Sequence, residues 1–309
     1  MPQTTIAIQT QGLTKDFGLR RAVNDLNISI EKGEIYSLLG TNGAGKTTTI
    51  KMLSCLIEPS NGSATLLGHD IKKHPMKVKE IIGVSPQETA ITGHLTVKEN
   101  LLLMGGVFGL KKDESHKRAQ ELMELMGLEE RKDQTRKLSG GLQRRLSIAM
   151  AMMSDPLILF LDEPTLGLDP AARKSVWNYI EKLKGEKTIL LTTHYLEEAD
   201  GLADHIAIIQ EGNIIAQGTA KELKEAHTTL KNINVDSDNV TQECIDELKK
   251  TGMDASFNTN GLIIRCATPD LYLITDILKK HKVKITGINW EEPTLDEVFL
   301  KLTGEKVSV

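Results

Sequence analysis

The sequence predicts an α/β protein of two domains, a large one over residues 1–220 and a small α+β one over residues 221–309. Segments typical of strands and of helices alternate through the first 220 residues. A glycine-rich loop joins an apolar strand to a helix near residue 40, and beyond residue 230 the order changes to βαββαβ. A chain of 309 residues is long enough for two domains, of which one buries a sizeable core.

In the first domain, short apolar runs predict the strands and longer mixed segments predict the helices. The run that follows Pro156 is continuously apolar, as expected of a strand covered on both faces in a parallel sheet. The predicted strands cover residues 28–30, 35–39, 81–84, 157–161, 188–192 and 206–209, and the predicted helices cover residues 46–56, most of 96–127 and 142–153.

In the second domain, a polar helical passage over residues 219–230 leads into the βαββαβ order, which is typical of a ferredoxin-like module. Asn260-Gly261 between two apolar runs is a hairpin signal. The predicted strands are 232–235, 254–258, 262–266 and 283–290, and the predicted helices are 241–251, 269–281 and 294–302, the last ending near Gly304.

Composition disfavours several classes of protein. The chain is 39% hydrophobic and 26% charged, and its net charge of −4 argues against a nucleic-acid partner. No apolar run approaches the ~18 residues that a membrane span needs, and the first ten residues do not resemble a signal peptide. The 3 cysteines have no CxxC spacing, which favours reduced thiols in a cytosolic protein.

The stretch GTNGAGKT, residues 40–47, fits the pattern GxxxxGK[ST] and lies between a strand and a helix. Its glycines let backbone N–H groups point at phosphates, Lys46 adds an ammonium, and the Thr47 hydroxyl can ligate Mg²⁺. The alternative is a glycine-rich turn that binds nothing. The candidate nucleotide-binding residues of this loop are Asn42, Gly43, Ala44, Gly45, Lys46, Thr47 and Thr48.

An apolar run at 157–161 ends in two carboxylates, Asp162 and Glu163. Asp162 suits a Mg²⁺ shell together with Thr47, and Glu163 could accept a proton from an attacking water. The alternative is a pair of solvated acids at the end of a strand.

A second glycine turn, LSGG at 138–141, opens the helix of residues 142–153. Free N–H groups, the Ser139 hydroxyl and the absence of side-chain bulk at Gly140 and Gly141 make another anion site. Because the first loop already holds one nucleotide's phosphates, this site makes most sense as a lid over the terminal phosphate held by another subunit. The alternative is an ordinary serine N-cap.

Three further residues have simple structural alternatives. Gln87 can be an ordinary polar loop residue, and a lone histidine such as His194 is more often structural than catalytic. Asp169 can cap the helix that Pro170 begins.

Together these motifs resemble the ATP-binding cassette (ABC) family over residues 5–220. The resemblance implies a P-loop NTPase fold with a parallel or mixed sheet core and a helical subdomain at about 90–155. It also implies a head-to-tail homodimer with two ATP molecules and Mg²⁺ sandwiched between subunits. The motifs are GTNGAGKT, Pro86-Gln87, LSGG, LILFLDEP at 157–164, LGLD at 166–169 and His194.

The same resemblance implies roles for single residues. Gln87 would ligate Mg²⁺ and link it to the transmembrane partner, and His194 would contact the γ-phosphate. Asp169 would communicate across the dimer. Phe17 would stack on adenine where many members have Tyr, and Leu142 stands where many members have Gln.

Within that family the chain resembles exporter ATPases encoded as separate chains, such as those of daunorubicin-resistance and sodium-efflux systems. The residues that carry this resemblance are LTKDFG, GVSPQE, THYLEEAD and EEPTLDEVFLKLTG at 291–304. It implies an ATPase held at the cytoplasmic side of the membrane by permease subunits that dock near residues 94–110, where the alternative is ordinary helical core. The transported substance is not predicted.

A cassette ATPase with a regulatory or translation-linked role is the alternative function. Translation-linked cassettes usually join two copies in one chain, whereas this chain has a single GKT and a single LSGG. A DNA-repair ATPase would carry a long coiled coil between Thr48 and Lys137, and no heptad run lies there. Intact Glu163 and His194 argue against a non-catalytic module.

Overall fold

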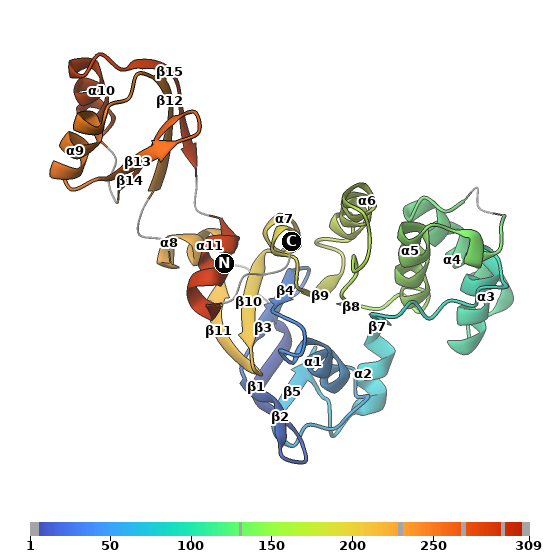
Figure 1. The fold of residues 1–309 in the computed structure, drawn as a ribbon. Helices are drawn as coiled ribbons and strands as arrows, with labels where there is room; N and C mark the ends of the chain where they lie inside the picture. Colours follow the sequence, from blue (N-terminus) through green and yellow to red (C-terminus); the bar gives the residue numbers. More distant parts are fainter. Residues whose placement is uncertain (1–5, 130–131, 228–230, 267–269, 292–293, 305–309) are drawn as a thin grey trace, which may run out of the picture. The chain divides into compact units, whose positions relative to one another are not determined.

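The structure is a computed structural model that describes residues 6–129, 132–227, 231–266, 270–291 and 294–304 (Figure 1). The chain divides into two compact units, the first running to Ala220 and the second beginning at Lys221. Each unit buries an apolar core of its own.

A six-stranded sheet in the order β11-β10-β4-β9-β8-β7 forms the centre of the first unit. All neighbours are parallel except the edge strand β11, which runs antiparallel to β10. Every residue of β4, β8 and β9 is buried, which explains their apolar sequences and confirms the predicted parallel strands. The strands are β4 (Ile35–Leu39), β7 (Ile82–Ser85), β8 (Ile158–Asp162), β9 (Thr188–Thr193), β10 (His205–Gln210) and β11 (Asn213–Gly218).

A second, antiparallel sheet in the order β2-β1-β5-β6, with β3 also paired to β1, lies in the same unit. Its apolar side chains share one core cluster with α1, α2 and side chains of the central sheet. The sequence predicted only the strand at residues 28–30 and missed the rest of this sheet. Its elements are β1 (Ile6–Phe17), β2 (Arg20–Leu26), β3 (Ser29–Glu31), β5 (Asn61–Leu66) and β6 (His69–Asp70), and the two helices are α1 (Lys46–Leu53) and α2 (Pro75–Ile81).

Helices cover the other side of the central sheet through a second core cluster. The segment predicted as helical over 96–127 consists of two helices, and the LSGG helix begins at Gly140, two residues before its predicted start. Figure 1 shows α3, α4 and α5 gathered beyond the edge strand β7. The elements are α3 (Val97–Val107), α4 (Lys112–Leu125), η1 (Thr135–Lys137), α5 (Gly140–Ala151), α6 (Pro170–Glu181) and α7 (Leu196–Leu202).

The second unit contains a four-stranded antiparallel sheet in the order β13-β14-β12-β15. Apolar residues on one face of the sheet form a core with α9 and α10. Residues 228–230 of the predicted helical passage, and Pro269 at the start of the next predicted helix, lie outside the described residues. The elements are α8 (Ala220–His227), β12 (Lys231–Asp238), α9 (Gln242–Lys250), β13 (Asp254–Asn258), β14 (Gly261–Cys266), α10 (Leu271–Lys280), β15 (Lys284–Glu291) and α11 (Leu295–Thr303).

In the described part of the chain, no helix combines the length and the apolar character needed to span a bilayer.

The second unit has a core of its own, so we expect residues 221–306 to fold when expressed alone. Circular dichroism should show a mixed α/β spectrum and a single cooperative thermal transition, as small single domains usually do. A fragment that stays aggregated, or that melts without a cooperative transition, would contradict this expectation.

Candidate active site

The loop between β4 and α1 is shaped to hold an anion. Gly45, the N-cap of α1, has φ +113°, and a Cβ built on it would lie 2.5 Å from the Ala22 carbonyl oxygen. Only glycine fits there without displacing the neighbouring backbone. The first turn of α1 carries no acidic residue and Gly45 supplies no side-chain cap, so its N–H groups remain available to a phosphate.

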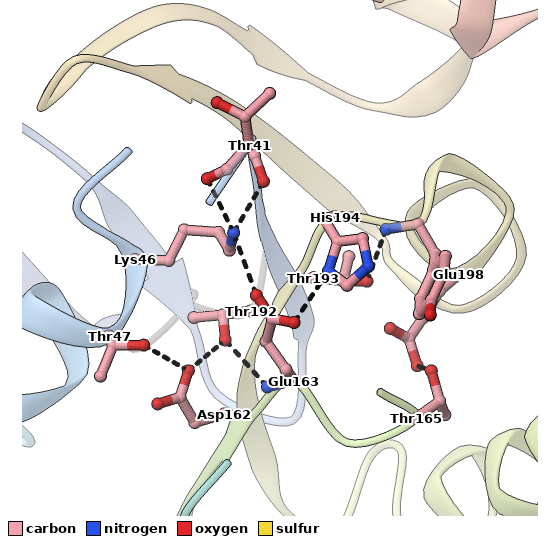
Figure 2. Close-up of polar contacts among 12 residues, drawn as sticks. Thr41, Lys46, Thr47, Asp162, Glu163, Thr165, Thr192, Thr193, His194 and Glu198 are labelled. Carbon is pink, nitrogen blue, oxygen red and sulfur yellow. Dashed lines mark hydrogen bonds and ion pairs between the residues drawn. The ribbon is translucent and has the colours of Figure 1, made fainter. Parts of the chain in front are cut away.

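Lys46 is the cation of this loop, and it is 4% exposed. Its Nζ donates to the carbonyl oxygens of Gly40 at 2.7 Å and Thr41 at 3.1 Å. It also forms an ion pair with Glu163 Oε1 at 3.1 Å (Figure 2). The ammonium therefore links the phosphate loop directly to the carboxyl end of β8.

Asp162, the last residue of β8, faces the start of α1. Its Oδ1 accepts from Thr47 Oγ1 at 3.1 Å and from Thr192 Oγ1 at 2.6 Å. The structure thus brings together two of the three candidate metal ligands of the sequence prediction, Thr47 and Asp162, although they lie far apart in the chain.

Glu163 adopts an unusual backbone conformation, with φ +48° for a residue that is not glycine. Its N–H donates to Thr192 Oγ1 at 3.0 Å, and its Oε2 lies 2.8 Å from His194 Nδ1. Such a conformation costs of order 1–3 kcal/mol and persists only where the surroundings impose it. The carboxylate is held between an ammonium and an imidazole rather than solvated, unlike the alternative of two surface acids.

A pocket of about 430 Å³ opens in front of these groups. That volume suits a small-molecule ligand. Phe17, at the end of β1, is 51% exposed and offers an apolar ring face at the pocket wall. The lining residues are Phe17, Arg20, Ala22, Asn42, Gly43, Gly45, Lys46, Thr47, Thr48, Gln87 and Glu163.

The donor set of the pocket fits Mg²⁺. Thr47, Asp162 and Gln87 offer hydroxyl, carboxylate and amide oxygens, and Thr47 and Gln87 both line the pocket. Mg²⁺ usually takes one or two protein oxygens and completes its shell with water and substrate phosphates. Among the described residues, no group of three or more His, Cys, Asp or Glu side chains forms a metal site of another kind.

The LSGG residues do not join this cluster. Between Ser139, Gly140 or Gly141 and residues 40–48, all of which the structure describes, there is no hydrogen bond or ion pair. Ser139 is the N-cap of α5, yet its side chain makes no capping hydrogen bond and lies exposed. Its hydroxyl therefore remains free for a ligand brought from outside the chain.

Asp169 also lies away from the phosphate loop. Its Oδ1 accepts from the N–H groups of Ala171 at 3.1 Å and Ala172 at 2.9 Å, so it caps α6 as the structural alternative predicts. Gly141 approaches the same helix so closely that a Cβ on it would lie 3.2 Å from the Ala172 side chain. The starts of α5 and α6 thus pack against each other.

The chain is similar in sequence to known ATP-binding proteins over almost its whole length. A daunorubicin/doxorubicin resistance ATP-binding protein of Streptomyces peucetius is 38% identical over 310 residues, covering 98% of this chain and 94% of that protein. A Nod factor export ATP-binding protein of Burkholderia lata is 36% identical, covering 97% of this chain and 98% of that protein. The family pattern described as ABC transporter matches residues 23–166. The chain belongs to the ABC transporter family.

A dimeric structure of a bacterial ABC transporter cassette superposes on this ABC protein with a TM-score of 0.62 at 26% identity, covering 69% of this chain and 98% of that one. The predicted family and the predicted P-loop ATPase fold are confirmed. This ABC protein is an ATP-binding subunit that hydrolyses ATP to power transport. Cassettes of its family form dimers and work with transmembrane subunits.

Three residues of the site escaped the sequence analysis of this ABC protein. Thr192 bridges Asp162 to the Glu163 N–H, Arg20 lines the pocket, and buried Glu198 accepts from Thr165 Oγ1 at 2.9 Å and from Trp177 Nε1 at 3.0 Å. Burial raises the pKa of the Glu198 carboxyl. No motif in the sequence marks these residues. Thr192 lies near the end of a strand, Arg20 follows a turn and Glu198 lies within a helix.

Thr192→Val keeps the shape of the side chain but removes the hydroxyl shared by Asp162 and Glu163. We expect a loss of about 1–3 kcal/mol in the free energy of unfolding, because Asp162 and the Glu163 N–H each lose one buried hydrogen-bond partner. Turnover should fall as well, since Glu163 loses one of the contacts that hold its strained backbone. Denaturant titration and steady-state ATP hydrolysis measure the two effects. Thr192→Ser, which keeps the hydroxyl, should behave much more like the parent, and equal effects of the two substitutions would contradict this role.

Proposed function

We propose that this ABC protein hydrolyses ATP with Mg²⁺ at a site completed by a second copy of itself, and so drives export of a substrate through a separate permease. The observation that carries the proposal is the contact of buried Lys46 and Glu163 at the wall of a pocket bounded by the phosphate loop, with partly exposed His194 on the other oxygen of Glu163. The names of two relatives, a drug-resistance protein and an export protein, support the direction of transport.

Glu163 is the proposed general base. Its carboxylate lies at the pocket wall, and its position is fixed by Lys46 on one oxygen and His194 on the other. A held carboxylate can accept the proton of a water that attacks the terminal phosphate. Lys46 and the N–H groups at the start of α1 stabilise negative charge on the phosphates, and His194 orients the base and approaches the γ-phosphate.

Thr47, Asp162 and Gln87 are the proposed ligands of Mg²⁺. When bound, the ion would neutralise charge on the phosphate oxygens during transfer. Because Gln87 also lines a second pocket, with Gly140 and Gly167, it lies between the nucleotide site and the LSGG helix. That placement supports the role that the family resemblance gives Gln87, a link between the ion and the permease side.

The second copy supplies the lid. Ser139 is exposed and not engaged in capping, and it opens a helix whose first turn contains no acidic residue. These features suit contact with the γ-phosphate bound by a partner chain. ATP binding then joins the two cassettes, and hydrolysis removes the contacts that hold them closed. A permease attached to both converts this closure into alternating access.

The permease is proposed to dock in a groove of about 430 Å³ that is mainly apolar. Leu56, which is 65% exposed, and Phe108, which is 41% exposed, line this groove. Large apolar side chains that are exposed together often mark a surface that binds a partner. The predicted docking segment 94–110 contains residues of both kinds. Val97 and Leu101 are buried in the core, whereas Val107 and Phe108 are exposed and available for contact with a permease. Such docking would hold the chain at the cytoplasmic side of the membrane.

We propose residues 1–220 as the ATPase domain, with its helical subdomain at about 90–155, and residues 221–309 as an accessory domain. The division of the chain between Ala220 and Lys221 supports this boundary. We assign the accessory domain to the ferredoxin-like class, supported by its βαββαβ order and its antiparallel sheet order β13-β14-β12-β15.

Glu163→Gln should keep ATP binding but lose steady-state hydrolysis by roughly 10²–10⁴-fold, the usual worth of a positioned base. The variant should also accumulate an ATP-bound dimer, visible by size-exclusion chromatography. Glu197→Gln is the matched control, because Glu197 is an exposed acid in the first turn of α7 and does not line the pocket. Near-normal turnover of Glu163→Gln would show that Glu163 is not the general base.

Ser139→Arg should prevent ATP-dependent dimer formation while the isolated chain still binds ATP. The reason is that the new side chain would fill the place proposed for the partner's phosphate, whereas Ser139 does not line the chain's own nucleotide pocket. Equilibrium binding of a fluorescent ATP analogue and sedimentation in the Glu163→Gln background measure the two properties. A collapse of nucleotide affinity in the monomer would show instead that Ser139 acts on its own chain's nucleotide.

A further inference from the structure

Arg144, on the second turn of the LSGG helix α5, is a buried charge that the mechanism above does not use. It is 4% exposed, and its guanidinium donates five hydrogen bonds, all to backbone carbonyl oxygens. Nε donates to Pro164 at 2.7 Å, Nη1 to Pro86 at 2.6 Å and Gln87 at 3.2 Å, and Nη2 to Asp162 at 2.5 Å and Glu163 at 2.6 Å.

All five N–H groups of the side chain are thereby satisfied. Because the guanidinium is planar and its donors form a rigid fork, it fixes these carbonyl groups relative to one another. Burial lowers the pKa of Arg144 to about 10, and the nearby carboxylates of Glu198, Asp162 and Glu163 act against that effect. The side chain therefore remains a cation near neutral pH.

The carbonyl groups belong to the two segments on which catalysis depends. One is the turn after β7 that carries Gln87, and the other is the strained turn after β8 that carries Glu163. Arg144 itself belongs to the helix that begins at Ser139. One side chain thus connects the surface offered to a partner's phosphate with the base and the metal-side glutamine of its own chain.

We propose that Arg144 is a positioning residue that couples the orientation of α5 to the placement of Glu163 and Gln87. The inference rests on the proposed two-chain site. When a partner's ATP engages Ser139, α5 is held in place, and Arg144 transmits this restraint to the Glu163 that serves the chain's own ATP. The two ATP sites of a dimer would then depend on each other through one arginine in each chain.

The test compares Arg144→Lys with a matched control in the full-length protein. Lysine keeps the charge but cannot hold five carbonyl groups, so kcat should fall by roughly 10²-fold, the scale of an ångström-size misplacement. Equilibrium ATP affinity should stay near the parental value, because residues 40–48 are untouched. The thermal midpoint should fall, because some buried carbonyl groups lose their donor, but the variant should stay folded at the assay temperature. Any sigmoidal dependence of the rate on ATP should become hyperbolic.

Arg145→Lys is the control, since Arg145 donates to the Met126 carbonyl at 3.0 Å and lies over the Tyr179 ring, away from the catalytic turns. It should keep parental kcat. In the Glu163→Gln background, Arg144→Lys should still permit an ATP-dependent dimer. If Glu163→Gln alone forms no ATP-dependent dimer, the proposed two-chain site is wrong. The comparison of kcat between Arg144→Lys and Arg145→Lys then tests separately whether Arg144 positions Glu163 of its own chain.

Unchanged kcat in folded Arg144→Lys would overturn the proposal. A second variant, Arg144→Gln, retains two donors in case lysine is poorly accommodated. If both variants unfold, or lose ATP affinity in step with turnover, Arg144 is a structural residue only and the proposal is also overturned.

Discussion

The buried ion pair of Lys46 and Glu163 is the constraint on which the site depends. Both side chains are almost fully buried, at 4% and 6% exposure, and a buried charge without a partner would be strongly destabilising. Lys46 follows β4 and Glu163 follows β8, so the pair forms only when these strands enter the sheet with β9 between them and their carboxyl ends level. The parallel register therefore decides whether Lys46 and Glu163 meet.

The parallel strands were predictable because they are largely buried and their sequences are mainly apolar. The antiparallel sheet was not, because β1 carries its apolar residues at irregular intervals. Its pairing with β2, β3 and β5 is interrupted by register shifts, and Gly12 within it has φ +59°. Bulges of this kind break the alternation on which strand prediction relies. Local sequence cannot reveal a strand whose pattern is set by its partners.

The same distinction separates the site residues that were predicted from those that were missed. Gly45, Lys46 and Thr47 act within one short loop, so their spacing alone predicts their chemistry. Thr192 and Arg144 act only through strands and turns distant in sequence. In the sequence, Arg144 resembles any arginine on an amphipathic helix, and such residues are mostly solvated. Its burial depends on five carbonyl groups that only the folded chain brings to one point.

The starts of α5 and α6 show how two similar helix openings serve different purposes. Both begin with a polar N-cap, and the two helices approach closely there, since a Cβ on Gly141 would lie 3.2 Å from the Ala172 side chain. The Asp169 carboxylate caps its own helix, α6, whereas the Ser139 hydroxyl makes no capping hydrogen bond to α5. A negative side chain at Ser139 would both cap α5 and repel a phosphate. A neutral, uncommitted hydroxyl leaves the free N–H groups of α5 attractive to an anion from outside, while capped α6 provides the rigid support behind them.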